Sequence, residues 1–169
     1  MREIDRLTVE QYATSSLLLM EAAADAALQS ISARFADGLQ GRRALILCGR
    51  GNNGGDGAAL ARGFARVGVH ANVVLFGRID ETKGDARLNF EAVQRLASYE
   101  AGSNSTPSLL SFVECDSVHA WEAIAGPRRT YDIMVDALFG TGLTRPLEGI
   151  HVQVIEHMAL SRRARDRAS

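Results

Sequence analysis

Polar side chains able to bind an ion or a nucleotide gather in one glycine-rich segment, GRGNNGGDGAAL, at residues 49–60. The segment directly follows the apolar run RALILC at residues 43–48. Asn52, Asn53 and Asp56 offer amide and carboxylate oxygens, which are the ligands that hard cations prefer. So few carboxylates suit K⁺ or Na⁺ better than Ca²⁺ or Mg²⁺. The alternative from local sequence is that Asn52 and Asn53 form a turn and Asp56 caps a helix.

The same segment satisfies the GxGxxG pattern of dinucleotide-binding oxidoreductases, through Gly49, Gly51 and Gly54. One observation speaks against that class, and a second does not decide the question. Asp56 at the start of the following helix would occupy the positive end of the helix dipole and repel a pyrophosphate. The second strand ends in Gly77 and Arg78 rather than in an acid for the ribose, although Arg78 would suit a 2′-phosphate. An NAD(P)-dependent oxidoreductase therefore stays a secondary hypothesis, and the absence of GK[ST] after the glycines excludes a Walker loop.

A second acid, Asp136, interrupts the apolar run IMVDALF at residues 133–139. A strand that is apolar on both faces is expected near the centre of its sheet. A carboxylate there is costly unless it is paired or coordinates a ligand. We therefore expect Asp136 to lie beside Asn52, Asn53 and Asp56. The alternative is an acid at the end of the strand that faces solvent.

The elements that must position these residues alternate between helix and strand patterns. Apolar residues between Leu17 and Phe35 recur at helical spacing and predict a long N-terminal helix. Apolar runs predict strands at 43–48, 71–77, 109–115 and 131–140, with helical patterns between them. This alternation predicts an α/β fold with a parallel, doubly wound sheet and helices on both faces. The first and fourth strands of such a sheet commonly lie side by side, so the loops at 49–57 and 140–149 should meet where the winding reverses.

Length and charge limit the class of protein. With 169 residues, 46% of them hydrophobic, the chain is expected to form one domain. Its 19 basic and 20 acidic residues leave a net charge of -1, so neither a nucleic acid nor an anionic membrane is indicated as a partner. The N-terminal stretch is charged from Arg2 onward and no apolar run is long enough to span a membrane, so we expect a cytoplasmic protein. The two cysteines and four histidines share no metal-ligand spacing, and we interpret the histidines as surface or helix-face residues.

Three segments in order resemble the YjeF N-terminal domain family, the NAD(P)H-hydrate epimerases: MREIDRLTVEQY with LLLMEAAADAA, then GRGNNGGDGAALAR, then VDALFGTGL. The resemblance extends to about residue 158. It implies a Rossmann-like three-layer α/β/α fold with a mostly parallel doubly wound sheet, a single domain over residues 1–169, and a homodimer. It also implies an isomerase of nicotinamide nucleotide repair that interconverts the R and S forms of hydrated NADH and NADPH, NAD(P)HX, for a partner dehydratase.

The resemblance further implies a substrate site together with a bound K⁺. The implied substrate-binding residues are Asn52, Asn53, Gly54, Gly55, Asp56, Gly140, Thr141, Gly142, Leu143, Thr144, Arg145 and Pro146. Asn53 and Asp136 would contribute oxygens to the ion. No hydride needs to move, because inversion at a hydroxyl-bearing carbon calls for proton transfer and polar positioning.

The sequence departs from the family after residue 158, where it reads ALSRRARDRAS. The family continues with a further apolar strand and a DIPSG-like segment, whose aspartate binds substrate and whose serine completes the ion site. We therefore expect a chain that lacks the family's last strand, exposes the run at 133–139 at or near a sheet edge, and epimerises slowly. Asp56 is the first candidate for a catalytic acid among the residues present. The alternative function is a non-catalytic nucleotide-ligand-binding or dimerisation module of the same fold.

Overall fold

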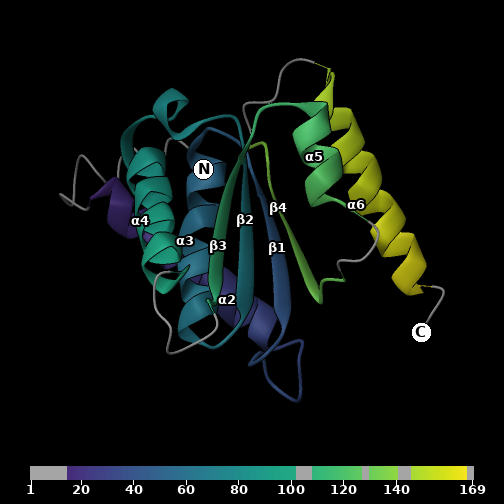
Figure 1. Cartoon of the computed structure of the whole chain (residues 1–169). Helices are drawn as coiled ribbons and strands as arrows, with labels where there is room; N and C mark the ends of the chain where they lie inside the picture. Colours follow the sequence, from purple (N-terminus) through teal and green to yellow (C-terminus); the bar gives the residue numbers. More distant parts are fainter. Residues whose placement is uncertain (1–14, 102–107, 127–129, 141–145, 167–169) are drawn as a thin grey trace.

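Strand and helix alternate along the chain in the computed structural model, which describes residues 15–101, 108–126, 130–140 and 146–166 (Figure 1). The strands are β1 (Arg43–Cys48), β2 (His70–Phe76), β3 (Leu110–Cys115) and β4 (Ile133–Ala137). The helices are α2 (Ser16–Ser32), α3 (Asn52–Arg66), α4 (Gly84–Ala101), α5 (Val118–Ile124) and α6 (Ile150–Asp166), with a short 3₁₀ turn η1 (Ile79–Glu81). None of the helices within these ranges is long and apolar enough to cross a membrane.

The strands form one parallel sheet with the order β3-β2-β1-β4. Helices α2, α3 and α4 cover one face of this sheet, and α5 and α6 cover the other (Figure 1). The predicted three-layer α/β/α fold, with its parallel doubly wound sheet and long N-terminal helix, is confirmed.

The winding reverses between β1 and β4. The chain runs from β1 to β2 to β3 in one direction, and β4 then pairs with the other side of β1. In this pairing Leu47 is the register partner of Asp136, and Cys48 is the partner of Ala137. The carboxyl ends of the first and fourth strands therefore lie next to each other, as the alternation predicts.

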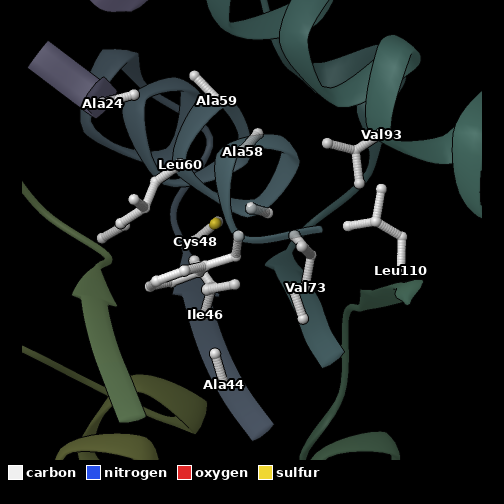
Figure 2. Packing of buried hydrophobic residues seen from close by; sticks show 14 of the residues in the cluster. Ala24, Ala44, Ile46, Cys48, Ala58, Ala59, Leu60, Val73, Val93 and Leu110 are labelled. Carbon is white, nitrogen blue, oxygen red and sulfur yellow. The ribbon is translucent and has the colours of Figure 1, made fainter. Parts of the chain in front are cut away.

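Strand β1 is buried on both faces because its side chains alternate between two cores. Ala44, Ile46 and Cys48 belong to the core under α2, α3 and α4, which Figure 2 shows at close range. Leu45 and Leu47 belong to the second core, under α5 and α6. This alternation explains why β1 reads as a continuous apolar run.

Strand β4 lies at the edge of the described sheet, and the expectation from its apolar pattern of a central, buried strand is wrong. Met134 and Val135 are half-buried, and Asp136 is exposed. Residues of this segment still pack into both cores, which accounts for its apolar character without a strand on its far side. The edge position expected from the family resemblance is the one observed for the described residues.

Candidate functional site

The turn between β1 and α3 is short, because α3 begins at Asn52 with Gly51 as its N-cap. The predicted loop over residues 49–57 is therefore wrong in its second part. Asn52–Asp56 form the beginning of the helix instead. Glycine is a poor helix former, and a pattern with Gly54, Gly55 and Gly57 gives no local signal for a helix. Tertiary packing overrides that propensity here.

Close packing accounts for the glycines of this segment. A Cβ atom at Gly49 would lie 1.9 Å from the carbonyl oxygen of Leu138, and one at Gly54 would lie 1.8 Å from the carbonyl oxygen of Gly49. A Cβ atom at Gly57 would lie 2.7 Å from the Cβ of Ala137. The first two turns of α3 therefore sit directly against the ends of β1 and β4. These glycines are explained by backbone approach, which a GxGxxG pattern alone cannot distinguish from a phosphate loop.

Asn53 links the two segments that the sequence analysis predicts to meet. Its side-chain Nδ2 donates a hydrogen bond to the carbonyl oxygen of Phe139 over 3.1 Å. The neighbouring Gly140 lies so close that a Cβ atom there would be 3.6 Å from the Cβ of Asn53. The structure therefore brings Asn53 and Gly140 together at the reversal point of the sheet.

Asp136 is exposed, so the expectation of a buried carboxylate is wrong, and the end-of-strand acid facing solvent is what the structure has. Its Oδ1 accepts the backbone N–H of Leu138 over 3.1 Å. Because Met134 packs into the core under α5 and α6, the side chain of Asp136, two residues later, projects to the same face. Asn53 instead projects from α3, which covers the other face. Exposure removes the argument that Asp136 needs a ligand to be stable.

Asp56 is half-buried in α3, and the first turn of that helix contains no acidic residue. The predicted repulsion between Asp56 and a pyrophosphate assumes that the helix begins at about Asp56, but α3 begins four residues earlier, at Asn52. In the structure the positive end of the α3 dipole is at Asn52, one turn before Asp56. A phosphate at the N-terminus of α3 is compatible with this arrangement.

The remaining predicted site residues are dispersed. Asn52 and Pro146 are exposed. Gly55 is buried on the opposite side of α3, where a Cβ atom would lie 2.8 Å from the Cα of Ala86 and 3.0 Å from the sulfur of Met20. The predicted residues Thr141, Gly142, Leu143, Thr144 and Arg145 lie outside the described residues.

A ring cluster that the sequence analysis does not predict lies beside Phe139. The imidazole of His151 is 5.1 Å from the ring of Phe139 and 5.9 Å from the ring of Phe76, centroid to centroid. Burial of the imidazole, helped by the charge of Arg50, lowers the pKa of His151, while a hydrogen bond with the backbone of Glu148 opposes the shift. The neutral form of this imidazole is therefore favoured more than that of an ordinary histidine. Its position at the start of the helix after the second glycine-rich segment is the signal that could have found it.

Charged groups surround the end of β2. Arg50 forms an ion pair of 3.0 Å with Glu81, whose second oxygen accepts the backbone N–H of Arg78 over 2.9 Å. The aliphatic part of Arg50 packs on Gly77, where a Cβ atom would lie 2.6 Å from the Cδ of Arg50. Arg50 thus holds one positive charge between the ends of β1 and β2.

The described residues support neither nucleophilic catalysis by Cys48 nor a metal site built from a cluster of His, Cys, Asp and Glu side chains. Burial raises the pKa of the Cys48 thiol, so this cysteine stays protonated and is not a nucleophile. Within the described ranges, no three His, Cys, Asp or Glu side chains are grouped to hold a metal ion. An ion bound here would rely on neutral oxygens in addition to one carboxylate.

Known proteins are similar to this chain in sequence, and a solved structure is similar to it in fold. A family model described as "YjeF-related protein N-terminus" matches residues 16–165. The bifunctional NAD(P)H-hydrate repair enzyme Nnr of Moorella thermoacetica is 36% identical over 155 residues, which are 92% of this chain and 27% of that protein. The NAD(P)H-hydrate epimerase of Rhodobacter capsulatus is 35% identical over 153 residues, which are 88% of this chain and 63% of that protein.

The crystal structure of yeast ynu0 (YNL200c) has the same fold, with a TM-score of 0.71 at 22% identity over 96% of this chain and 63% of that one. The chain thus spans less than two thirds of the length of each of these proteins. The match of the family model over residues 16–165 shows that the chain belongs to the family of YjeF-related N-terminal domains.

Proposed function

We propose that this chain interconverts the R and S epimers of hydrated NADH and NADPH, as an isomerase of nicotinamide nucleotide repair. One observation carries the proposal: Asn53 and the Phe139–Gly140 segment meet at the reversal point of the sheet, where doubly wound folds bind their ligands. The names of the relatives, NAD(P)H-hydrate epimerase and bifunctional NAD(P)H-hydrate repair enzyme, support it. A cytoplasmic location and a functional link to an NAD(P)H-hydrate dehydratase are parts of the same proposal.

The arrangement suits a dinucleotide that is bound without being oxidised. The N-terminus of α3 has neither a side-chain cap nor an acidic residue in its first turn, so its dipole can attract a phosphate. Asn53 is oriented by Phe139, and Arg50 adds a positive charge nearby. Inversion at a hydroxyl-bearing carbon needs such positioning and a proton carrier, with no acceptor for a hydride.

A K⁺ ion held by Asn53 and Asp136 is part of the proposal: their oxygens are of the kind that such an ion takes, although the two side chains project from different faces of the sheet. The hydrogen bond from Nδ2 to Phe139 fixes the amide of Asn53 and directs its oxygen away from that carbonyl. Asp136 offers a carboxylate, of which Oδ1 accepts the N–H of Leu138. One amide and one carboxylate oxygen suit a monovalent cation. When bound, the ion would supply positive charge for the phosphates of the substrate.

The activity is tested in a coupled assay. An S-specific dehydratase consumes the S epimer of hydrated NADPH, and the chain must regenerate it from the R epimer. We expect the chain to restore consumption of the R epimer and Asn53→Ala to slow it. The matched control is Asn72→Ala, because the Asn72 amide also donates to a backbone carbonyl, that of Ala44 at 3.4 Å, but at the amino end of the sheet.

The outcomes separate the hypotheses. No conversion by the unmodified chain would overturn the epimerase proposal. Binding of hydrated NADPH without conversion would support the alternative of a non-catalytic nucleotide-ligand-binding module of the same fold. Equal activity of Asn53→Ala and Asn72→Ala would show that the reversal point between β1 and β4 is not the site.

We also propose that the chain forms a homodimer. The carboxyl-proximal helix α6 exposes apolar side chains, with Leu160 64% and Val152 38% exposed, and α2 exposes Leu18 to 62%. Light scattering coupled to gel filtration measures the mass directly. A monomer at high concentration would refute the homodimer and leave the proposed activity untouched.

A further inference from the structure

We propose that His151 is the acid–base residue of this site, which takes the proton of the substrate's hydroxyl group during inversion and then returns it. The inference rests on the proposed function and adds to it a proton carrier in the described part of the chain. It differs from the sequence-based expectation, in which Asp56 is the first candidate among the residues present.

The position of His151 relative to the site carries the proposal. Phe139 contacts both groups: its carbonyl accepts the amide of Asn53 over 3.1 Å, and its ring lies 5.1 Å from the imidazole of His151. His151 also lies 5.9 Å from Phe76, the last residue of β2. The imidazole therefore sits at the edge where the strands end, and Figure 1 shows α6 beginning at that edge.

The surroundings of His151 favour the neutral form of its imidazole, which can accept a proton. Burial lowers the pKa of the imidazole, and the Arg50 guanidinium lowers it further. Arg50 in turn forms an ion pair of 3.0 Å with Glu81. A hydrogen bond with the backbone of Glu148 opposes this shift and raises the pKa of His151.

The reaction needs a group of this kind. Hydration of a reduced nicotinamide places the hydroxyl group on the carbon bonded to the ring nitrogen. Protonation of the ring double bond leaves the positive charge on that carbon, and water adds there. Inversion then follows in balanced steps. Neutral His151 takes the hydroxyl proton, the carbon–nitrogen bond breaks with its electron pair on nitrogen, and a carbonyl forms. After the carbonyl group rotates about its bond to the neighbouring carbon, the nitrogen attacks the other face of the carbonyl. The imidazolium then returns the proton to the oxygen.

A second histidine on the same helix supplies the matched control. His157 is also half-buried, and burial lowers its pKa as well. Its ring meets the edge of Trp121 at 5.4 Å, in the contact between α5 and α6. His157 thus shares the burial and the helix of His151, but its ring contact is with Trp121 of α5.

The test compares His151→Phe with His157→Phe in the coupled assay described above. Phenylalanine keeps a ring against Phe76 and Phe139 but cannot carry a proton. We expect His151→Phe to lower kcat by about 10²–10⁴-fold with KM changed less than about threefold, and His157→Phe to stay within about threefold of the unmodified chain. The decline of kcat at acidic pH should disappear in His151→Phe.

A second measurement uses the unmodified protein and therefore does not require a variant to fold. In the NMR spectrum of the unmodified protein, hydrated NADPH should shift the imidazole resonance of His151 and leave that of His157 unchanged. Turnover of His151→Phe at the unmodified rate, or an unmoved His151 resonance at saturating ligand, would overturn the assignment while the epimerase proposal stood. An unmodified chain that converts no R epimer would instead overturn the proposed function, and this inference with it.

Discussion

The side-chain amide of Asn53 donates to the carbonyl oxygen of Phe139 across 86 positions of sequence. This hydrogen bond joins the first turn of α3 to the residues that follow β4. It spans the reversal point of the sheet, and a second bond, from the N–H of Gly49 to the carbonyl of Ala137 at 2.9 Å, closes the same junction. The two hydrogen bonds hold the end of β1 and the start of α3 against the end of β4, so substitutions at this junction are expected to lower the stability of the fold.

Gly49→Ala should lower the free energy of unfolding by about 2–3 kcal/mol, because the new Cβ atom would meet a backbone carbonyl that cannot rotate away. The contact would be 1.9 Å, to the oxygen of Leu138. Urea denaturation measures the change. Gly51→Ala is the control, because no atom lies within 4 Å of a Cβ atom there. Equal destabilisation by the two variants would contradict the packing account of the glycines.

Asn89→Ala should destabilise the contact between α2, α3 and α4 by about 1–3 kcal/mol, because it removes a buried polar partner. Asn89 is only 2% exposed; it donates to the carbonyl of Asp85 over 3.1 Å and accepts from Arg62, which also pairs with Glu21. Chemical denaturation again gives the value. For comparison, Glu91→Ala removes two ion pairs within α4, with Arg87 and Arg95, and should cost no more than about 1 kcal/mol. A neutral Asn89→Ala variant would mean that the network contributes nothing to stability.

Potassium should raise the melting temperature above that measured in tetramethylammonium at equal ionic strength, because an ion bound only by the folded state stabilises it. Asp136→Ala should abolish the difference between the two salts. Asp132→Ala is the control: Asp132 is the residue before β4, and its carboxylate accepts the backbone N–H of Arg43 over 2.8 Å, at the opposite end of the strand. Identical melting curves of the unmodified chain in both salts would remove the ion from the proposal.

The free energy of unfolding should fall on acidification, in part through His157. Burial lowers the pKa of His157 below its ordinary value in the folded state, so the unfolded chain binds the proton more readily. The stability contributed by the neutral ring is complete above the unfolded pKa of about 6.5 and is lost as pH falls toward the folded pKa. His157→Phe should flatten this dependence in urea titrations at about pH 7.5 and about pH 5.5. His119→Phe, which replaces an exposed histidine of α5, is the matched control substitution, and a dependence equally steep in His157→Phe would disprove the assignment.

The fold and the place of the candidate site follow from the sequence. Alternating strand and helix patterns predict the parallel sheet, and the winding rule predicts that β1 and β4 are neighbours, as their register shows. The continuous apolar run of β1 predicts a strand buried on both faces, because apolar side chains at successive positions point to opposite faces of the sheet. The structure places these side chains in both cores. The meeting of Asn53 with Gly140 follows from these two predictions together.

Three features depended on the tertiary structure. The start of α3 at Asn52 is decided by contacts of Gly49, Gly54 and Gly57 with distant backbone and side chains, against the low helix propensity of glycine. The exposure of Asp136 depends on the order of the strands, which places β4 at the edge of the sheet. A strand at the centre of a sheet and a strand at an edge covered by helices can have the same apolar sequence pattern, so the sequence does not distinguish them. His151 joins Phe76 and Phe139 only because β2, β4 and α6 converge at one edge, and no sequence periodicity encodes a contact between side chains of three separate elements.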